Sequence, residues 1–238
     1  MKYIDHTFPT PAENLACDEA LLDLAEAGGG GEVLRFWEPP GTFVVLGYAN
    51  QAAREADLPA CRAAGVEVYR RCSGGGTVLQ GPGCLNYSLI LGVGTSGLDS
   101  ITGANCFIME RQRRALAPLV PAPVEVLGHT DLATGGRKFS GNAQRRKRRF
   151  LLFHGTLLLD FDLNQIGKLL RPPSRQPAYR QGRSHGDFLT NLHLPGNAVK
   201  TALREAWGAR EPLAGLPVER VARLSREKYG RMEWSLQR

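Results

Sequence analysis

Long apolar runs are missing from this sequence of 238 residues. No stretch approaches the roughly 18 apolar residues that a membrane-spanning helix needs. The first residues, MKYIDHTF, also lack the basic and then apolar pattern of a secretory signal. These two absences predict a cytoplasmic protein with no membrane partner.

Cysteine is scarce as well. The 5 cysteines are odd in number and none of them forms a Cys-x-x-Cys pair, which disfavours a disulfide framework and a structural zinc site. We therefore expect reduced thiols at Cys17, Cys61, Cys72, Cys84 and Cys106.

Acidic residues are outnumbered, since 30 Lys and Arg against 23 Asp and Glu give a net charge of +7. An excess of this sign favours an acidic partner, either nucleic acid or an acidic protein. The basic run at residues 145–149 lies between two predicted strands, which favours a solvated hairpin turn; docking of an acidic partner is the alternative. No helix-turn-helix, RRM or zinc-finger pattern accompanies the run, so we do not expect nucleic acid to be the partner.

The length and the 42% hydrophobic content suit a single folded domain. Thr10-Pro11-Ala12-Glu13 has the form of a capping box and predicts a helix from Pro11 to the glycines at 28–31. Strands at 32–37 and 42–47 flank a Pro-Pro-Gly turn and predict a hairpin. The later elements that we predict are helices at 52–64, 106–119, 197–207 and 217–228 and strands at 66–70, 86–91, 124–127, 132–134, 138–144 and 150–161.

A glycine-rich segment, Ser73-Gly74-Gly75-Gly76, follows a predicted strand and is preceded by Arg70 and Arg71. Free backbone N–H groups and two cations can hold a phosphate or a carboxylate. The segment is neither a Walker A loop nor a dinucleotide fingerprint, because GxxxxGK[ST] and GxGxxG are both missing. On its own it is equally consistent with a tight structural turn.

Lys138 and His154 are two further candidates. Lys138 begins a strand after two glycines and before small residues, where its charge could act on a transferring carbonyl or phosphate oxygen. An exposed lysine at a strand end is the alternative. His154 lies inside an apolar strand, which fits a hydrogen-bonded core histidine as well as a base.

Taken together, these segments resemble the lipoate-protein ligase A family in order and spacing, over about residues 10–170. The segments that carry the resemblance are NLACDEALL at 14–22, RRCSGGGTV at 70–78, Asn86, Thr130-Asp131-Leu132, GRKFSGNAQ at 136–144 and HGTLL at 154–158. The segment at 14–22 lies in a predicted helix, and most of the other segments contain one of the candidates Arg71, Lys138 and His154. Each motif is weak alone, but the ordered set is specific.

The resemblance implies the biotin/lipoate ligase catalytic fold, which is related to class II synthetases. That fold is α+β, with a mixed, mostly antiparallel sheet flanked by helices. The resemblance also implies one catalytic domain over residues 1–238, without the C-terminal accessory domain of well-known ligases. A separate accessory subunit would then be one way to complete the activity.

By the same resemblance, lipoate or octanoate reacts with MgATP to give an acyl-adenylate, and the acyl group passes to a lysine of a lipoyl carrier domain. The carrier would be an E2 subunit, the glycine-cleavage H protein or a similar protein. Lys138 would be catalytic and would contact both the acyl carbonyl and the α-phosphate, while Arg71 would hold phosphate. The backbone of residues 76–79 would line the adenylate pocket, and the acyl chain would lie near Leu46, Val78 and Leu79.

Asp131 is the carboxylate that the resemblance offers as a ligand for Mg²⁺, although many ligases have Asn-Asp-Leu where this chain has Thr130-Asp131-Leu132. The metal contacts at that point are therefore expected to differ. The full set expected to bind ATP or the acyl-adenylate is Arg70, Arg71, Ser73, Gly74, Gly75, Gly76, Thr77, Val78, Leu79, Asn86, Asp131, Lys138, Ser140, Gly141, Ala143, His154, Gly155 and Thr156.

Two other functions remain open. A cysteine-dependent octanoyltransferase of the same fold takes its acyl group from acyl carrier protein without ATP, through a cysteine in the loop before the Gly-Arg-Lys strand. Residues 125–130 contain no cysteine, which favours the ligase; Cys72 would be a substitute nucleophile unless it is a buried, inert thiol. The third function is a non-catalytic module that binds a lipoyl carrier, and the intact Arg71, Gly76 and Lys138 set argues against it.

Overall fold

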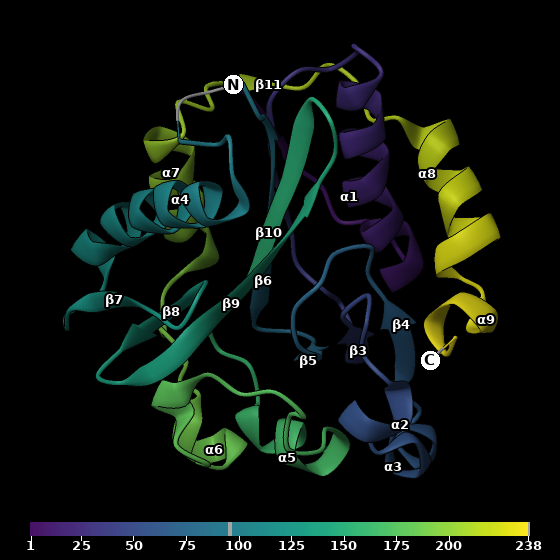
Figure 1. Ribbon diagram of the computed structural model, residues 1–238, viewed down its shortest axis with the longest axis vertical. Helices are drawn as coiled ribbons and strands as arrows, with labels where there is room; N and C mark the ends of the chain where they lie inside the picture. Colours follow the sequence, from purple (N-terminus) through teal and green to yellow (C-terminus); the bar gives the residue numbers. More distant parts are fainter. Residues whose placement is uncertain (95–96, 238) are drawn as a thin grey trace.

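The computed structural model describes residues 1–94 and 97–237. Within these residues, eight strands form one large sheet, in which β1 is parallel to β2 and β11 and all other neighbours are antiparallel (Figure 1). The sheet is mixed and mostly antiparallel, as predicted. In spatial order its strands are β11 (Glu211–Pro212), β1 (Lys2–Asp5), β2 (Val33–Trp37), β6 (Cys84–Gly92), β10 (Phe150–Leu158), β9 (Arg137–Arg146), β8 (Asp131–Thr134) and β7 (Val124–Leu127).

A smaller sheet consists of β4 (Glu67–Arg70), β3 (Phe43–Leu46) and β5 (Val78–Gln80). The predicted hairpin of residues 32–37 and 42–47 is wrong, because β2 and β3 belong to different sheets. All five residues of β2 are buried, and the strand pairs with β1 on one side and β6 on the other. The Pro39-Pro40-Gly41 segment carries the chain from one sheet to the other instead of folding it back.

Helices cover both faces of the large sheet (Figure 1). Helix α1 (Pro11–Glu26) lies on one face, with α8 (Val218–Leu224) packed outside it, and α4 (Ile101–Leu116) and α7 (Gly196–Ala206) lie on the other. The alternation along β10 fits this arrangement, since Leu152 joins the core cluster of α1 whereas Leu151 and Phe153 join that of α4 and α7.

Local capping signals set several helix boundaries. The predicted capping box of α1 is present, with the Glu13 amide donating to Thr10 Oγ1 at 3.2 Å and the Thr10 amide donating to Glu13 at 3.1 Å. Helix α4 begins at Ile101, earlier than predicted, because the Ser100 hydroxyl accepts from the Gly103 amide.

The predicted helix at 52–64 is divided into α2 (Ala52–Glu55) and α3 (Leu58–Ala63), because Asp57 starts a new helix as its N-cap. The remaining helical elements are α5 (Ile166–Leu169), α6 (His185–Phe188), α9 (Met232–Ser235), 3₁₀ turns at Ala117–Leu119, Leu163–Gln165 and Ala178–Arg180, and a π-turn at Ser225–Tyr229. None of the helices in the described ranges is both long and apolar enough to cross a membrane.

Residues 147–149 of the basic run form the turn between β9 and β10, as predicted, whereas Arg145 and Arg146 belong to β9. Two cations of the turn contact the end of α1. Lys147 Nζ lies 2.5 Å from Asp23 Oδ1, and the Arg149 side chain donates to the Glu26 carbonyl. The turn is therefore attached to the helix as well as solvated.

Candidate active site

A cavity of about 560 Å³ lies where the two sheets meet. Its walls come from α1 and β2, from the glycine-rich segment and β5, from β9 and β10, and from residues between Pro173 and Leu189. A concave site of this volume is of the size that holds a small organic ligand. The cavity therefore collects residues from four regions that are distant in the sequence.

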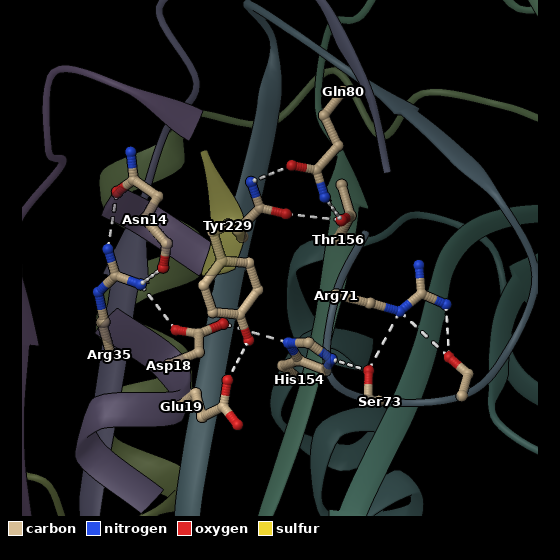
Figure 2. Close-up of polar contacts among 12 residues, drawn as sticks. Asn14, Asp18, Glu19, Arg35, Arg71, Ser73, Gln80, His154, Thr156 and Tyr229 are labelled. Atoms are coloured by element: carbon tan, nitrogen blue, oxygen red, sulfur yellow. Dashed lines mark hydrogen bonds and ion pairs between the residues drawn. The ribbon is translucent and has the colours of Figure 1, made fainter. Parts of the chain in front are cut away.

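Arg71 shapes the glycine-rich segment. Its Nη2 donates to the carbonyl oxygens of Gly74 and Gly76 at 2.6 and 2.7 Å. Its Nε donates to Ser73 Oγ at 3.1 Å (Figure 2). Burial lowers the pKa of the guanidinium to about 10, which leaves it charged at neutral pH. The cation holds the loop from inside, so most of its donors are already used before any phosphate arrives.

Close backbone packing explains two of the glycines. Gly75 has φ +84, a left-handed conformation that favours glycine. A Cβ added to Gly47 would overlap with the carbonyl oxygen of Gly75. The glycine-rich segment can thus approach the residues after β3 this closely only because Gly47 has no side chain.

A chain of hydrogen bonds runs from Arg71 to α1 (Figure 2). Ser73 Oγ lies 2.5 Å from His154 Nε2, and His154 Nδ1 lies 3.1 Å from Asp18 Oδ2. Burial alone would raise the pKa of Asp18, but the Arg35 guanidinium and the His154 bond outweigh it, so the pKa lies below its usual 3.8.

The direction of these bonds follows from the charge on Asp18. An ionised carboxylate only accepts, so Nδ1 of His154 carries the proton, and in the neutral ring Nε2 then accepts from the Ser73 hydroxyl. This chain fixes the tautomer of His154 and ties the glycine-rich segment to the helix across the cavity.

Three further polar side chains form a closed ring of hydrogen bonds. Gln80 Nε2 donates to Thr156 Oγ1 at 3.0 Å, Thr156 Oγ1 donates to Asn86 Oδ1 at 2.6 Å, and Asn86 Nδ2 donates back to Gln80 Oε1 at 3.2 Å (Figure 2). All three side chains line the cavity. Their polar atoms largely satisfy one another, so this part of the wall is pre-organised.

Lys138 stands on the same wall, near the start of β9. Its Nζ lies 2.8 Å from Asp131 Oδ1, and Asp131 Oδ2 accepts from the Tyr179 hydroxyl at 2.8 Å. Both Lys138 and Asp131 are only partly buried and line the cavity. The ammonium ion is thus available to a ligand while it is held by a carboxylate.

Most of the residues predicted from the sequence lie on the cavity wall. These are Arg71, Gly75, Gly76, Thr77, Val78, Leu79, Asn86, Asp131, Lys138, Ser140, Gly141, Ala143, His154, Gly155 and Thr156. Ser73 and Gly74 lie behind the wall, where Ser73 acts through His154 and Gly74 through Arg71.

Besides Ser73 and Gly74, two more predicted residues do not line the cavity. The fully buried Arg70 donates instead to the carbonyl oxygens of Gly47, Tyr48 and Asn50, and to those of Trp234 and Ser235 in α9. Leu46, which we expected beside the acyl chain, is buried in the core of the small sheet because its side chain points away from the cavity wall.

Several cavity residues were not predicted. Asp18 and Trp37 come from α1 and β2, and Arg175, Arg180 and His185 come from the segment that follows α5. Burial lowers the pKa of His185 below its usual 6.5. The buried polar residues of α1 and the cationic residues in a loop rich in proline and glycine were signals that could have indicated these positions.

The residues present do not form a magnesium cage. Both oxygens of Asp131 are engaged, and across the described residues no three His, Cys, Asp or Glu side chains gather as metal ligands. Mg²⁺ held by one carboxylate would depend on substrate phosphates for its other ligands. The expected metal role of Asp131 therefore stays a prediction, in which the ATP phosphates would supply most of the other ligands.

The cysteines stay away from this chemistry. In the described part of the chain, no cysteine lines the cavity. Cys72, the closest in sequence, is buried, and burial raises the pKa of its thiol to about 12. The thiol is therefore protonated and unreactive at neutral pH.

Comparison with known proteins assigns the chain to a family. The family described as the lipoyl protein ligase A/B catalytic domain matches residues 10–203. The chain belongs to this family. One relative is an octanoyltransferase LipM of Carboxydothermus hydrogenoformans. It is 28% identical over an alignment of 269 positions, which covers 98% of this chain and 97% of the relative.

Solved structures of lipoate-protein ligases have the same fold as this chain. A lipoate-protein ligase A bound with ATP has a TM-score of 0.81 at 23% identity, covering 99% of each chain. A bi-partite lipoate protein ligase from Thermoplasma acidophilum has a TM-score of 0.80 at 22% identity, covering 99% of this chain and 95% of that one. The predicted α+β ligase fold is confirmed. The chain is a lipoate-protein ligase or a related lipoyl or octanoyl transferase.

Proposed function

We propose that the chain is an ATP-dependent lipoate-protein ligase. It would activate lipoate or octanoate as an acyl-adenylate and transfer the acyl group to a specific lysine of a lipoyl carrier domain. The observation that carries the proposal is a cavity with Lys138 on its wall and, among the described residues, no cysteine in its lining. Such a site offers a cation for charge stabilisation but no thiol for a thioester.

In the first step, a carboxylate oxygen of the acid attacks the α-phosphorus of ATP. The bond from that phosphorus to the bridging oxygen breaks, and pyrophosphate leaves. The Lys138 ammonium offsets the negative charge that builds up on the phosphate and acyl oxygens, which is most effective in a site that excludes water. Mg²⁺ would enter on the ATP phosphates and supply further positive charge.

In the second step, the amine of the carrier lysine attacks the acyl carbonyl. The bond from the carbonyl carbon to the phosphate oxygen breaks, AMP leaves, and the amine loses a proton to give the amide. Lys138, on the cavity wall, would again stabilise the oxygen on which charge develops. Arg71 acts on the glycine-rich segment, whose shape it fixes, more than on the phosphate itself.

The substrate chemistry fits the rest of the wall. Trp37, Val78 and Leu79 are apolar lining residues that can take a saturated acyl chain, whereas Arg175 and Arg180 add positive charge. The net charge of +7 suits an acidic carrier domain. One lipoate protein ligase among the solved structures is bi-partite, which fits the expected separate accessory subunit.

A second candidate is octanoyl transfer from acyl carrier protein without ATP. The LipM relative favours it, because it spans nearly the whole chain. A cysteine route would need a reactive thiol near Lys138, and Cys72 does not supply one. The exposed Cys106 lies on α4 and is not part of the cavity lining.

The test is an intact-mass assay of an apo lipoyl domain. Three mixtures are compared: lipoate with MgATP, octanoate with MgATP, and octanoyl carrier protein without ATP. We expect modification with the first two. Modification with the third alone would replace the ligase by the transferase. Modification that appears only with a second polypeptide would assign adenylation to the complex.

Lys138→Ala should abolish transfer and leave the fold intact. Lys168→Ala is the matched control, because Lys168 is an exposed lysine of α5 that does not line the cavity. Normal turnover of Lys138→Ala would remove Lys138 from the mechanism.

A further inference from the structure

We infer that Asp131 is a positioning residue which, together with Tyr179, orients the Lys138 ammonium ion toward the transferring acyl group. The inference rests on the proposed function only for the catalytic role of Lys138 in acyl transfer. It gives Asp131 a role other than binding a metal. It also assigns a role to Tyr179, which lies in the 3₁₀ turn Ala178–Arg180, far from Lys138 in the sequence.

The three side chains form a line of contacts. Lys138 Nζ lies 2.8 Å from Asp131 Oδ1, and the Tyr179 hydroxyl donates to Asp131 Oδ2 at 2.8 Å. The carboxylate is more buried than the ammonium, with exposed fractions of 13% and 24% for the two side chains. Asp131 thus lies behind Lys138, and the outer side of the ammonium remains available to a ligand.

The sheet supplies the path for the lysine side chain. Asp131 is opposite Gly141 across β8 and β9, and a register shift between Leu132 and Ala133 follows. A Cβ on Gly141 would lie 2.7 Å from Lys138 Nζ and 2.9 Å from Lys138 Cε. The Lys138 side chain therefore reaches Asp131 by crossing the space that glycine leaves open.

Tyr179 is held in place by the start of β9. Arg183 donates to the carbonyl oxygens of both Tyr179 and Gly136, at 2.8 and 3.1 Å. The Thr190 amide donates to the Lys138 carbonyl at 2.9 Å. The segment that carries Tyr179 is therefore attached to the same backbone that carries Lys138, so the two side chains keep a fixed relation.

The Tyr179 hydroxyl is suited to donating. Burial, and then the negative charge of Asp131, raise the pKa of Tyr179, so the phenol keeps its proton at neutral pH. Its bond occupies one carboxylate oxygen and leaves the other for Lys138. A metal ion at Asp131 would have to share the carboxylate with these two partners.

The inference can be tested without a ligand by NMR of the lysine side-chain ammonium groups. In the wild type we expect an ordered Lys138 Nζ, and in Asp131→Asn and Tyr179→Phe a more mobile one. Lys200 is an internal control, since its ammonium is held by Asp5 and Glu38 and should not change. Asp160→Asn is the matched control, because Asp160 is a strongly exposed carboxylate that does not line the cavity.

Steady-state kinetics of acyl transfer supply the second readout. They are measured with the acyl donor that supports transfer by the wild type. For Asp131→Asn we expect kcat to fall about 10- to 100-fold, because a small displacement of a catalytic group is costly, with KM for the acyl substrate nearly unchanged. Tyr179→Phe should follow in the same direction, and neither variant should raise the Mg²⁺ concentration that gives half-maximal rate.

Two results would overturn the inference. One is an unchanged Lys138 Nζ order in Asp131→Asn. The other is a selective rise in the Mg²⁺ requirement of that variant, which would make Asp131 a metal ligand. If the wild type transfers no acyl group from any donor, the proposed function fails, and the ligand-free NMR comparison still decides whether Asp131 and Tyr179 position Lys138.

Discussion

Asp18 and Arg35 form an ion pair that is almost completely buried, with 2.6 Å between Oδ1 and Nη1 and exposed fractions of 3% and 0%. Arg35 also donates from Nη1 to the Asn14 carbonyl oxygen and from Nη2 to Asn14 Oδ1. The pair fixes α1 to β2 at the edge of the cavity, and the second oxygen of Asp18 orients His154.

Asp18→Asn should therefore be strongly destabilising. Removing one partner of a buried pair leaves the other charge without compensation, which costs about 3–5 kcal/mol. Urea unfolding followed by circular dichroism measures the loss. Asp23→Asn is the control on the same helix, because its pair with Lys147 is partly exposed and should contribute less than about 1 kcal/mol. Equal losses in the two variants would contradict the prediction.

Acid should remove the same stabilisation. The folded-state pKa of Asp18 lies below its usual 3.8, so the stability it contributes is fully present above that value and is lost as the pH falls through the lower, folded pKa. The free energy of unfolding of the wild type should fall steeply below about pH 4. Asp18→Asn should show a shallower acid limb, and parallel curves would exclude this carboxylate as a source of the dependence.

The packing of Gly47 against Gly75 gives a third prediction. In Gly47→Ala the new methyl group meets the Gly75 carbonyl, so the glycine-rich segment must move, and we expect a loss of about 1–3 kcal/mol together with weaker ligand binding. Gly76→Ala is the control for stability, since a Cβ there has no heavy atom within 4 Å. Thermal melts of the two variants, with and without substrate, separate the effects.

These features differ in how far the sequence predicts them. The capping box of α1 and the bounds of β7 depend on neighbouring residues, and both agree with prediction. The pairing of β2 with β6 joins residues about 50 positions apart, and local turn signals at Pro39 and Pro40 do not contain that information.

The candidate site shows the same division. Residues in contiguous motifs, such as Lys138 and the glycines at 75–76, could be named from the sequence, and they lie on the cavity wall. The partners of those residues could not. The contact of Lys138 with Asp131 depends on the register of two strands, and that of Asp131 with Tyr179 on how a distant loop folds. The resemblance implies that Arg71 holds phosphate, whereas the bonds of Arg71 to its own loop are visible only in three dimensions.

Thiol chemistry offers a fourth prediction. Cys106 is exposed and the other four cysteines are buried, so iodoacetamide should label Cys106 first in the folded protein. Peptide mass spectrometry identifies the labelled site. Cys72→Ala should retain acyl transfer, because burial raises the pKa of that thiol to about 12. Loss of transfer in Cys72→Ala, with a normal melting temperature, would favour a cysteine route.

The last prediction concerns Arg71. In Arg71→Lys the charge remains, but one ammonium cannot reproduce the bonds from Nη2 to Gly74 and Gly76 and from Nε to Ser73. Loss of bonds to a charged donor costs about 1.5–3 kcal/mol each, although part of this is regained from the new lysine. The glycine-rich segment should become mobile while the sheets stay intact.

NMR relaxation measures this directly. The backbone order parameters of Gly74 to Thr77 should fall in Arg71→Lys, whereas those of β6 and β10, in the middle of the large sheet, should be unaffected. KM for the acyl acid and ATP should rise, because the loop that shapes their pocket is no longer fixed. If Arg71 instead served mainly to bind phosphate, KM for ATP would rise with no change in the order parameters of the ligand-free loop.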